Sequence, residues 1–158
     1  MYAATRKLIA ARTKHVKYPL STARVKQLGG GTFGDCYENS HRGIDRKNKI
    51  QIVSGWLVGR YDPFSCSTEI TSHFWNVRNG TDMIDFTPIP YPDMEYVVDM
   101  DFIAFGQKNY DTYSSMVPSS LLLKNDKFQL VSGDHSTGLR FHEVDELTNE
   151  NLFQAFRI

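Results

Sequence analysis

The chain is poor in cysteine, has no excess of either charge and contains no long apolar run. Its two cysteines, Cys36 and Cys66, form no CxxC or Cys/His tandem, so the sequence predicts neither a disulfide scaffold nor structural zinc. No apolar run reaches about 18 residues, which excludes a transmembrane helix and argues against a membrane partner. The 18 basic and 18 acidic residues balance, and zero net charge argues against nucleic acid as a partner.

The N-terminal segment departs from this balance because it is basic and free of acids. The basic residues that precede the first acid, Asp35, are Arg6, Lys7, Arg12, Lys14, Lys17, Arg24 and Lys26. The segment lacks the apolar core of a secretory signal. Its composition overlaps with that of a transit peptide, but it runs without a break into the glycine-rich stretch that follows. We therefore expect a cytoplasmic protein of one domain, residues 1–158, in which residues 1–25 form a basic helix or arm with a solvated face. A phosphate-binding arm is the alternative.

Residues 29–36, Gly-Gly-Gly-Thr-Phe-Gly-Asp-Cys, place a thiol directly after a group of glycines. Glycine adopts left-handed backbone conformations without steric cost, so the stretch predicts a flexible loop that presents Cys36. If a helix begins at this cysteine, its unpaired N–H groups favour the thiolate over the thiol. The stretch has no Gly-Lys-Ser/Thr, which argues against a phosphate-binding loop.

The remaining pattern predicts a single α+β domain with an antiparallel sheet. Strands are expected over residues 50–58, 69–77, 82–87, 95–100 and 127–131, and helices over residues 3–15, 36–46 and 148–156. Residues 104–120 receive no assignment. The dipeptide Asn79-Gly80 indicates a two-residue hairpin between the second and third strands.

This hairpin brings a histidine and an acid close together. With Asn79 and Gly80 as the only loop residues, Phe74 faces Asp85, and His73 lies one position from direct opposition. A bulge or a three-residue loop places His73 and Asp85 side by side. A carboxylate beside an imidazole fixes its tautomer and stabilises the imidazolium. Cys36 facing this pair completes a set of nucleophile, base and orienting acid.

Three motifs in this order resemble the papain-like and transglutaminase-like thiol enzymes, in particular small uncharacterised bacterial and phage proteins of this type. They are Asp35-Cys36-Tyr37-Glu38-Asn39, His73-Phe74-Trp75-Asn76 and Ile84-Asp85-Phe86-Thr87-Pro88, with Gly55-Trp56-Leu57 between the first two. The resemblance covers roughly residues 27–90.

The resemblance implies a cysteine-bearing helix packed on an antiparallel sheet, and acyl transfer at a carbonyl by amide hydrolysis, deamidation or transamidation. Cys36 is then the nucleophile, His73 the base and Asp85 the orienting group, without a cofactor, and the substrate is a peptide, a protein or a small amide. Gln27 and Gly34 are candidates for the oxyanion or substrate-binding site, together with Trp75 as a wall. Gln27 lies further from the cysteine than is usual in papain-like enzymes, so the Cys36 backbone N–H is the alternative oxyanion donor.

Several other interpretations remain open. Cys36 and His73 alone are compatible with an inert core cysteine and a structural histidine, and a non-catalytic binding or inhibitor protein on the same fold is the main alternative function. Cys66 lies in a turn-rich loop and receives no catalytic role. A metal site is not predicted, because the further histidines follow no helical spacing; they are His41, His135 and His142. The segment 132–138 is interpreted as a surface turn, with a binding loop as the alternative, and the oligomeric state is left open.

Overall fold

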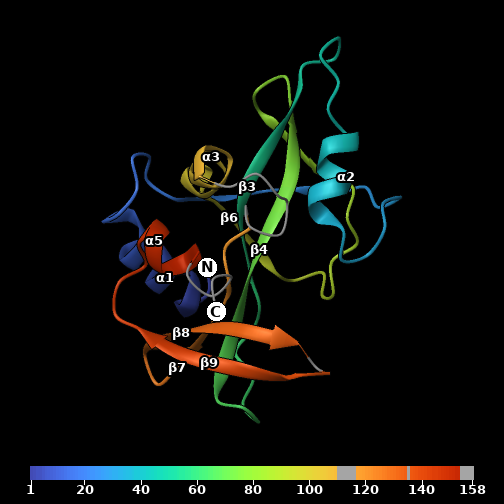
Figure 1. The fold of residues 1–158 in the computed structure, drawn as a ribbon. Coiled ribbons are helices and arrows are strands. Elements are labelled where there is room, and N and C mark those ends of the chain that lie inside the picture. Colours follow the sequence, from blue (N-terminus) through green and yellow to red (C-terminus); the bar gives the residue numbers. More distant parts are fainter. Residues whose placement is uncertain (110–116, 135, 154–158) are drawn as a thin grey trace.

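The computed structural model describes residues 1–109, 117–134 and 136–153 (Figure 1). Its fold is α+β, with a mostly antiparallel open sheet and few helices, which confirms the α+β part of the predicted fold class. The strands are β1 (Ser21–Ala23), β2 (Lys26–Gln27), β3 (Ile50–Val58), β4 (Ser67–Arg78), β5 (Asp82–Asp85), β6 (Glu95–Val98), β7 (Ser120–Lys124), β8 (Lys127–Asp134) and β9 (Gly138–Val144). The helices are α1 (Ala3–Thr13), α2 (Cys36–Arg42), α3 (Met100–Asn109) and α5 (Asn149–Phe153).

The two longest strands, β3 and β4, form the centre of the sheet, whose order is β1-β6-β3-β4-β7-β8-β9. Strand β5 adds to one end of β4, and β2 pairs with β5 in parallel. On the edge opposite β3, β4 pairs with β7 over residues 67–70 and with β5 over residues 76–78. Within the described chain, residues 71–75 have no strand partner on this edge. His73 lies in this gap.

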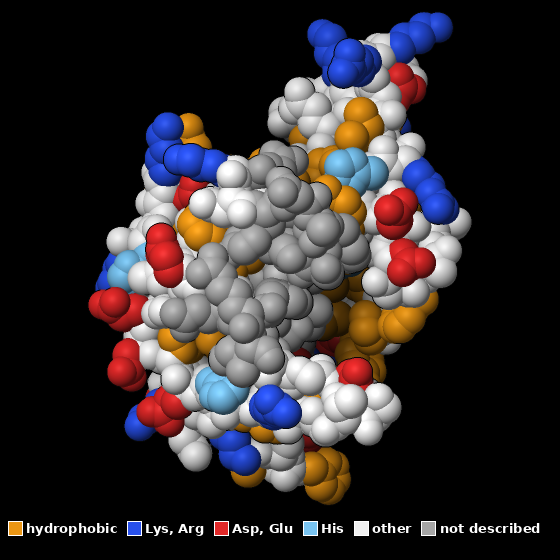
Figure 2. Space-filling model, viewed as in Figure 1, with side chains coloured by type: hydrophobic (Ala, Val, Ile, Leu, Met, Phe, Trp, Pro, Cys, Tyr) orange, Lys and Arg blue, Asp and Glu red, His pale blue; other side chains and the backbone are white. Residues whose placement is uncertain are grey.

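Successive residues of β3 alternate between two apolar clusters, as the period of a strand requires. Trp56 and Val58 belong to the larger cluster, which includes residues of α1, α3 and α5, and Val53 and Leu57 belong to a smaller one. Figure 1 shows α2 on one side of the β3–β4 pair and α1, α3 and α5 on the other. Acidic and basic side chains are both spread over the face seen in Figure 2. No helix in the described ranges is both long and apolar enough to span a membrane.

The expected basic helix at residues 3–15 exists as α1, but its solvated face is wrong at one position. Arg12 is fully buried. Its Nε donates to Asp99 Oδ2 at 2.8 Å, and its terminal nitrogens donate to Leu147 O and Asn149 Oδ1. Trp56 Nε1 donates to the same Asp99 oxygen at 2.9 Å. One ion pair therefore ties α1 to the central sheet and to the segment before α5.

Several element boundaries differ from expectation. The helix expected to reach residue 46 ends at Arg42, where Gly43 packs against Asn76 and has no room for a Cβ. The strand expected over residues 95–100 ends at Val98, and α3 begins at Met100. The residues around this boundary are compatible with either a strand or a helix. The helix expected over residues 148–156 spans Asn149–Phe153, and residues 154–156 lie outside the described part of the chain.

Replacing Arg12 with Met leaves the Asp99 carboxylate buried without its cation. We expect the free energy of unfolding to fall by about 3–5 kcal/mol, because removing one partner of a buried pair leaves an uncompensated charge. Urea unfolding measures this loss. Lys14→Met, at an exposed position of the same turn, is the matched control and changes stability by less than about 0.5 kcal/mol. Equal stability of the two variants would contradict the role given to the ion pair.

Candidate active site

The loop before Cys36 uses its glycines as predicted. Gly29, Gly30 and Gly34 have φ values of +67°, +89° and +84°, the left-handed region that favours glycine. The loop is also tied to the end of β5: Leu28 N donates to Asp85 O, and Gly31 N to Phe86 O, both at 2.8 Å. The glycines therefore shape a loop that backbone hydrogen bonds attach to the end of β5.

Asn39, a buried residue of α2, holds the same loop from the other side. Its side chain accepts from Thr32 N at 3.2 Å and donates to Thr32 O at 2.8 Å and to Thr87 Oγ1 at 2.9 Å. A Cβ on Gly31 would lie 2.6 Å from the Asn39 side chain, which explains the glycine there. The Asn39 amide thus joins the loop, the helix and the segment after β5.

Helix α2 begins at Cys36 and packs against β4. Asn76 Nδ2 donates to the carbonyl oxygen of Ser40 at 2.9 Å, and the rings of Tyr37 and Phe74 lie 5.1 Å apart, edge to face. These contacts place the first turn of α2 beside the unpaired segment of β4.

The hairpin turn occurs at Asn79 and Gly80, but the two-residue loop predicted for it is wrong. Both residues have positive φ, as their turn type requires. The register pairs Arg78 with Asp82, so Thr81 is an extra loop residue. This shift by one puts Asp85 on the same face of the sheet as His73, because side chains alternate along a strand. A three-residue loop was the condition under which the sequence placed these two side chains together.

His73 and Asp85 form a buried pair. His73 Nε2 lies 2.7 Å from Asp85 Oδ2, and their exposed fractions are 4% and 0%. Thr87 N donates to the other carboxylate oxygen, Oδ1, at 2.9 Å. Because Nε2 is engaged with Asp85, the second ring nitrogen, Nδ1, is the one available to Cys36.

Cys36 and His73 line one hollow. Burial on its own would lower the pKa of His73, but its hydrogen bond to Asp85 and the neighbouring Cys36 outweigh burial and raise this pKa to about 9. His73 therefore holds its proton at neutral pH, as expected of an imidazole placed between a carboxylate and a thiol.

Tyr96 is a site residue that the sequence analysis missed. Its hydroxyl donates to Asp85 Oδ2 at 2.6 Å, the oxygen that His73 also contacts. Burial, followed by this hydrogen bond, raises the pKa of Tyr96, so the phenol keeps its proton. No local motif marks it, because Tyr96 lies on β6 and reaches Asp85 across the sheet from the far side of β3.

Gly55 on β3 makes this reach possible. It lies opposite His73 in the register, and a Cβ there would collide with the Val97 carbonyl oxygen and the Trp75 ring. Without a Cβ, the Trp75 ring lies over β3, stacked on His73 at 6.0 Å and edge-on to Tyr96 at 5.2 Å. The aromatic rings exclude water around the His73–Asp85 pair.

A hollow of about 290 Å³ opens at Cys36 and His73. Its other walls include Phe33 of the glycine loop, Leu57 of β3 and Ile89 of the loop after β5. The described lining residues carry no Lys, Arg, Asp or Glu. Phe33 is 64% exposed at the rim. The thiol is therefore reachable, while its partner pair is buried.

The other candidate residues lie as follows. Gln27 lies on β2 opposite Asp85; its Nε2 donates to Thr87 O at 2.7 Å and lies 3.5 Å from Asp85 Oδ2, so this amide supports the acid. Gly34 lines the hollow at Cys36, whereas Trp75 is buried behind His73 and is not among the described lining residues. Cys66 is exposed in the turn before β4, and it is not among the described residues that line this hollow.

Two of the three histidines considered as metal ligands lie on described elements. His41 is on α2 and His142 is on β9 at the far edge of the sheet, whereas His135 lies outside the described residues. Among residues 1–109, 117–134 and 136–153, no three His, Cys, Asp or Glu side chains are grouped as metal ligands.

No protein family, curated protein or solved structure was found that matches this chain. Interpretation of the site therefore depends on its own geometry.

Replacing Asp85 with Asn tests the source of the raised His73 pKa. The pKa of His73 should fall from about 9 toward or below its ordinary value of 6.5, because the carboxylate is lost while burial remains. NMR titration of the imidazole measures it, and Asp82→Asn on the same hairpin is the control. In the wild type, protonation of His73 contributes to the free energy of unfolding. This contribution is complete below pH 6.5 and is lost as the pH rises through about 9. An unchanged titration in Asp85→Asn would refute this assignment.

Proposed function

We propose that the protein is a thiol-dependent acyl-transfer enzyme that uses Cys36, His73 and Asp85 for amide hydrolysis, deamidation or transamidation. The observation that carries the proposal is that Cys36 and His73 line the same hollow, with His73 Nε2 2.7 Å from a buried Asp85 carboxylate. A papain-like or transglutaminase-like core is part of the proposal. The order of α2 with its cysteine, β4 with its histidine and β5 with its acid supports this assignment.

In the first step, the Cys36 proton resides on His73, and the sulfur attacks the substrate carbonyl carbon. The resulting C–S bond gives a tetrahedral oxyanion. Collapse of this intermediate breaks the carbon–nitrogen bond, and the imidazolium of His73 donates its proton to the departing amine. A thioester on Cys36 and a free amine remain.

In the second step, water or an amine attacks the thioester, and His73 takes the proton of the attacking group. Collapse of the second oxyanion breaks the C–S bond and returns the thiolate, which completes hydrolysis or transfer. Asp85 keeps its charge throughout and stabilises the imidazolium. The buried position of Asp85 strengthens this effect, because the surrounding dielectric is low.

The backbone N–H of Cys36 is the oxyanion donor in this proposal. It belongs to the first turn of α2, whose N–H groups have no partner within the helix. The Gln27 amide is directed to Thr87 O and the Asp85 carboxylate, so we assign it to positioning of the acid. Gly34, with its left-handed backbone beside the thiol, leaves space for the substrate.

A non-catalytic binding protein would be favoured if Cys36 lay far from His73 or were closed off by aromatic side chains. The hollow that Cys36 and His73 share supports the catalytic proposal over this alternative. A cytoplasmic location belongs to the same proposal. Both cysteines are free, and the cytosol keeps a thiol nucleophile reduced.

The reactivity of Cys36 can be compared with that of Cys66 in the same chain. At pH 7 we expect iodoacetamide to alkylate Cys36 at least about tenfold faster than Cys66, although Cys66 is the more exposed thiol, because a thiolate beside an imidazolium is the nucleophile. Peptide mass spectrometry measures the two rates. His73→Gln should remove the difference. Equal rates in the wild type would refute the proposal.

Acyl transfer is tested with p-nitrophenyl acetate as a general acyl donor. We expect a burst of p-nitrophenolate and an acetyl group on Cys36 in the wild type and in Cys66→Ser, but not in Cys36→Ser. Alkylation without a burst would restrict the site to thiol chemistry and contradict an acyl-transfer function.

Tyr96→Phe removes one donor to Asp85 and keeps the ring. A hydrogen bond to a charged group contributes about 1.5–3 kcal/mol, so the acylation rate should fall by about tenfold or more. The low-field NMR signal of the His73 Nε2 proton should move as well, because its acceptor shifts. Tyr18→Phe, at an exposed position, is the control. A change in the unfolding midpoint alone would limit Tyr96 to a structural role.

A further inference from the structure

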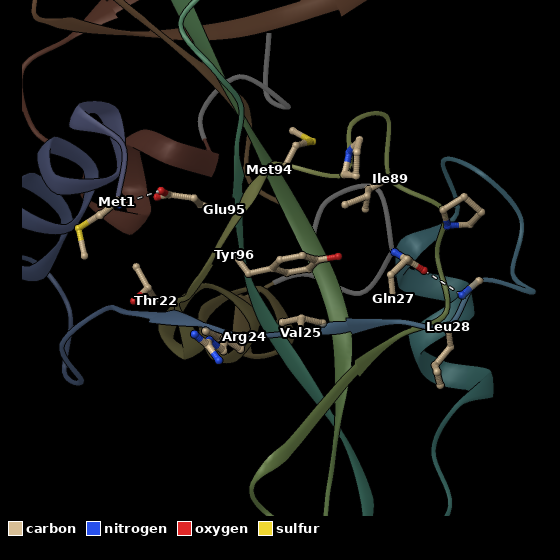
Figure 3. Close-up of a pocket in the computed structure, with 14 residues that line it drawn as sticks. Met1, Thr22, Arg24, Val25, Gln27, Leu28, Ile89, Met94, Glu95 and Tyr96 are labelled. Atoms are coloured by element: carbon tan, nitrogen blue, oxygen red, sulfur yellow. Dashed lines mark hydrogen bonds and ion pairs between the residues drawn. The ribbon is translucent and has the colours of Figure 1, made fainter.

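A second and larger hollow, of about 1020 Å³, shares lining residues with the first. Figure 3 shows the residues that line it. Its walls come from β1, β2, β6 and the loop after β5. Pro88, Ile89 and Met94 of that loop line both hollows. Gln27 and Tyr96, the two side chains that support Asp85, also border it. The larger hollow therefore begins where the buried acid of the site is held.

Among the described residues that line this hollow, Arg24 is the charged side chain without a counter-ion. It is exposed in the segment between β1 and β2, and it forms no ion pair with any residue that the structure describes. Glu95, the acid in the described lining, is already engaged by Tyr2 N at 2.7 Å and by Thr5 Oγ1 at 2.5 Å. Figure 3 shows Arg24 and Gln27 spaced along the same stretch of chain. The hollow is thus suited to an anionic group at its Arg24 end.

The shape and chemistry of the walls favour an extended peptide. Val25, Leu28, Ile89 and Met94 supply apolar surface. Arg24 and Val25 lie between β1 and β2 and belong to neither strand. Among the described strands, β1 pairs with β6 alone, so its outer edge can pair with an added strand, which is a common mode of peptide recognition.

We propose that this hollow is a groove for an extended peptide substrate, whose carboxylate pairs with Arg24 while a carbonyl of the same peptide reaches Cys36. This inference rests on the proposed function, because it names the substrate class of the Cys36 site. The carboxylate belongs either to an Asp or Glu side chain or to the C-terminus of the peptide.

The strand geometry sets the length of that peptide. Arg24 and Gln27 are three residues apart in an extended segment, which corresponds to about 10 Å at about 3.3 Å per residue. From Gln27 the peptide continues past Pro88, Ile89 and Met94, which line both hollows, to Cys36. A six-residue extended peptide is about 20 Å long, so it covers the stretch from Arg24 to Gln27 and leaves about 10 Å to reach Cys36.

The test measures how far peptides protect Cys36 from iodoacetamide. Three acetylated peptides of six residues, made of Ala and Phe with one variable terminal residue, are compared: Glu with an amidated C-terminus, Gln with an amidated C-terminus, and Gln with a free C-terminus. One or both acidic peptides should protect about fivefold better than the neutral peptide, as an exposed ion pair predicts. The acidic peptide that protects better identifies the source of the carboxylate.

Arg24→Glu should abolish this preference, and Lys26→Glu should retain it. Lys26 is also basic and exposed, but it is not among the described residues that line the hollow. Equal protection by all three peptides, or equal behaviour of the two variants, would overturn the groove assignment. Such a result leaves the proposed function intact when Cys36 still reacts rapidly with iodoacetamide. A Cys36 that reacts no faster than Cys66 would instead refute the proposed function.

Discussion

The buried carboxylate of Asp85 is the group on which the arrangement of the site depends. It is fully enclosed, and it is satisfied by His73, the Thr87 backbone and Tyr96, with Gln27 at 3.5 Å. An unpaired buried charge costs several kcal/mol, so each donor is held in place by the others. These donors come from β4, β6, β2 and the segment after β5. Correct folding of four separate segments is therefore a condition for orienting one imidazole.

A second buried carboxylate organises the opposite end of β6. Arg12 and Trp56 donate to the Asp99 carboxylate, and Ser54 donates to the Asp99 backbone carbonyl. Asp99 lies three residues beyond Tyr96. Strand β6 thus supplies Tyr96 to the Asp85 group and leads directly into Asp99. The Asp99 group anchors α1 and the larger core, while the Asp85 group serves the candidate active site. Because β6 pairs with the central strand β3, both buried acids are held by the same part of the sheet.

Local patterns in the sequence predict the central part of this structure well. The β-branched run of β3, the Asn79-Gly80 turn and the α+β class all follow from short-range preferences. The helix α3 and the donor Tyr96 do not. Met100–Asn109 mixes strand and helix formers, so its sequence does not specify one element. In the structure it is a helix whose Phe102 packs against Trp56 of β3. Tyr96 acts across two neighbouring strands, and no spacing in the sequence encodes a contact between strands that are distant along the chain.

The extra residue Thr81 makes the site sensitive to the parity of the hairpin loop. With three loop residues, Asp85 shares a face with His73. Loss or gain of one residue would turn the acid to the other face, whereas a change of two residues would restore the pairing. Substitutions in this turn are thus a smaller hazard than single insertions or deletions. In this hairpin an odd loop length, or an even one with a compensating bulge, keeps Asp85 on the face of His73, and the identity of the loop residues is secondary.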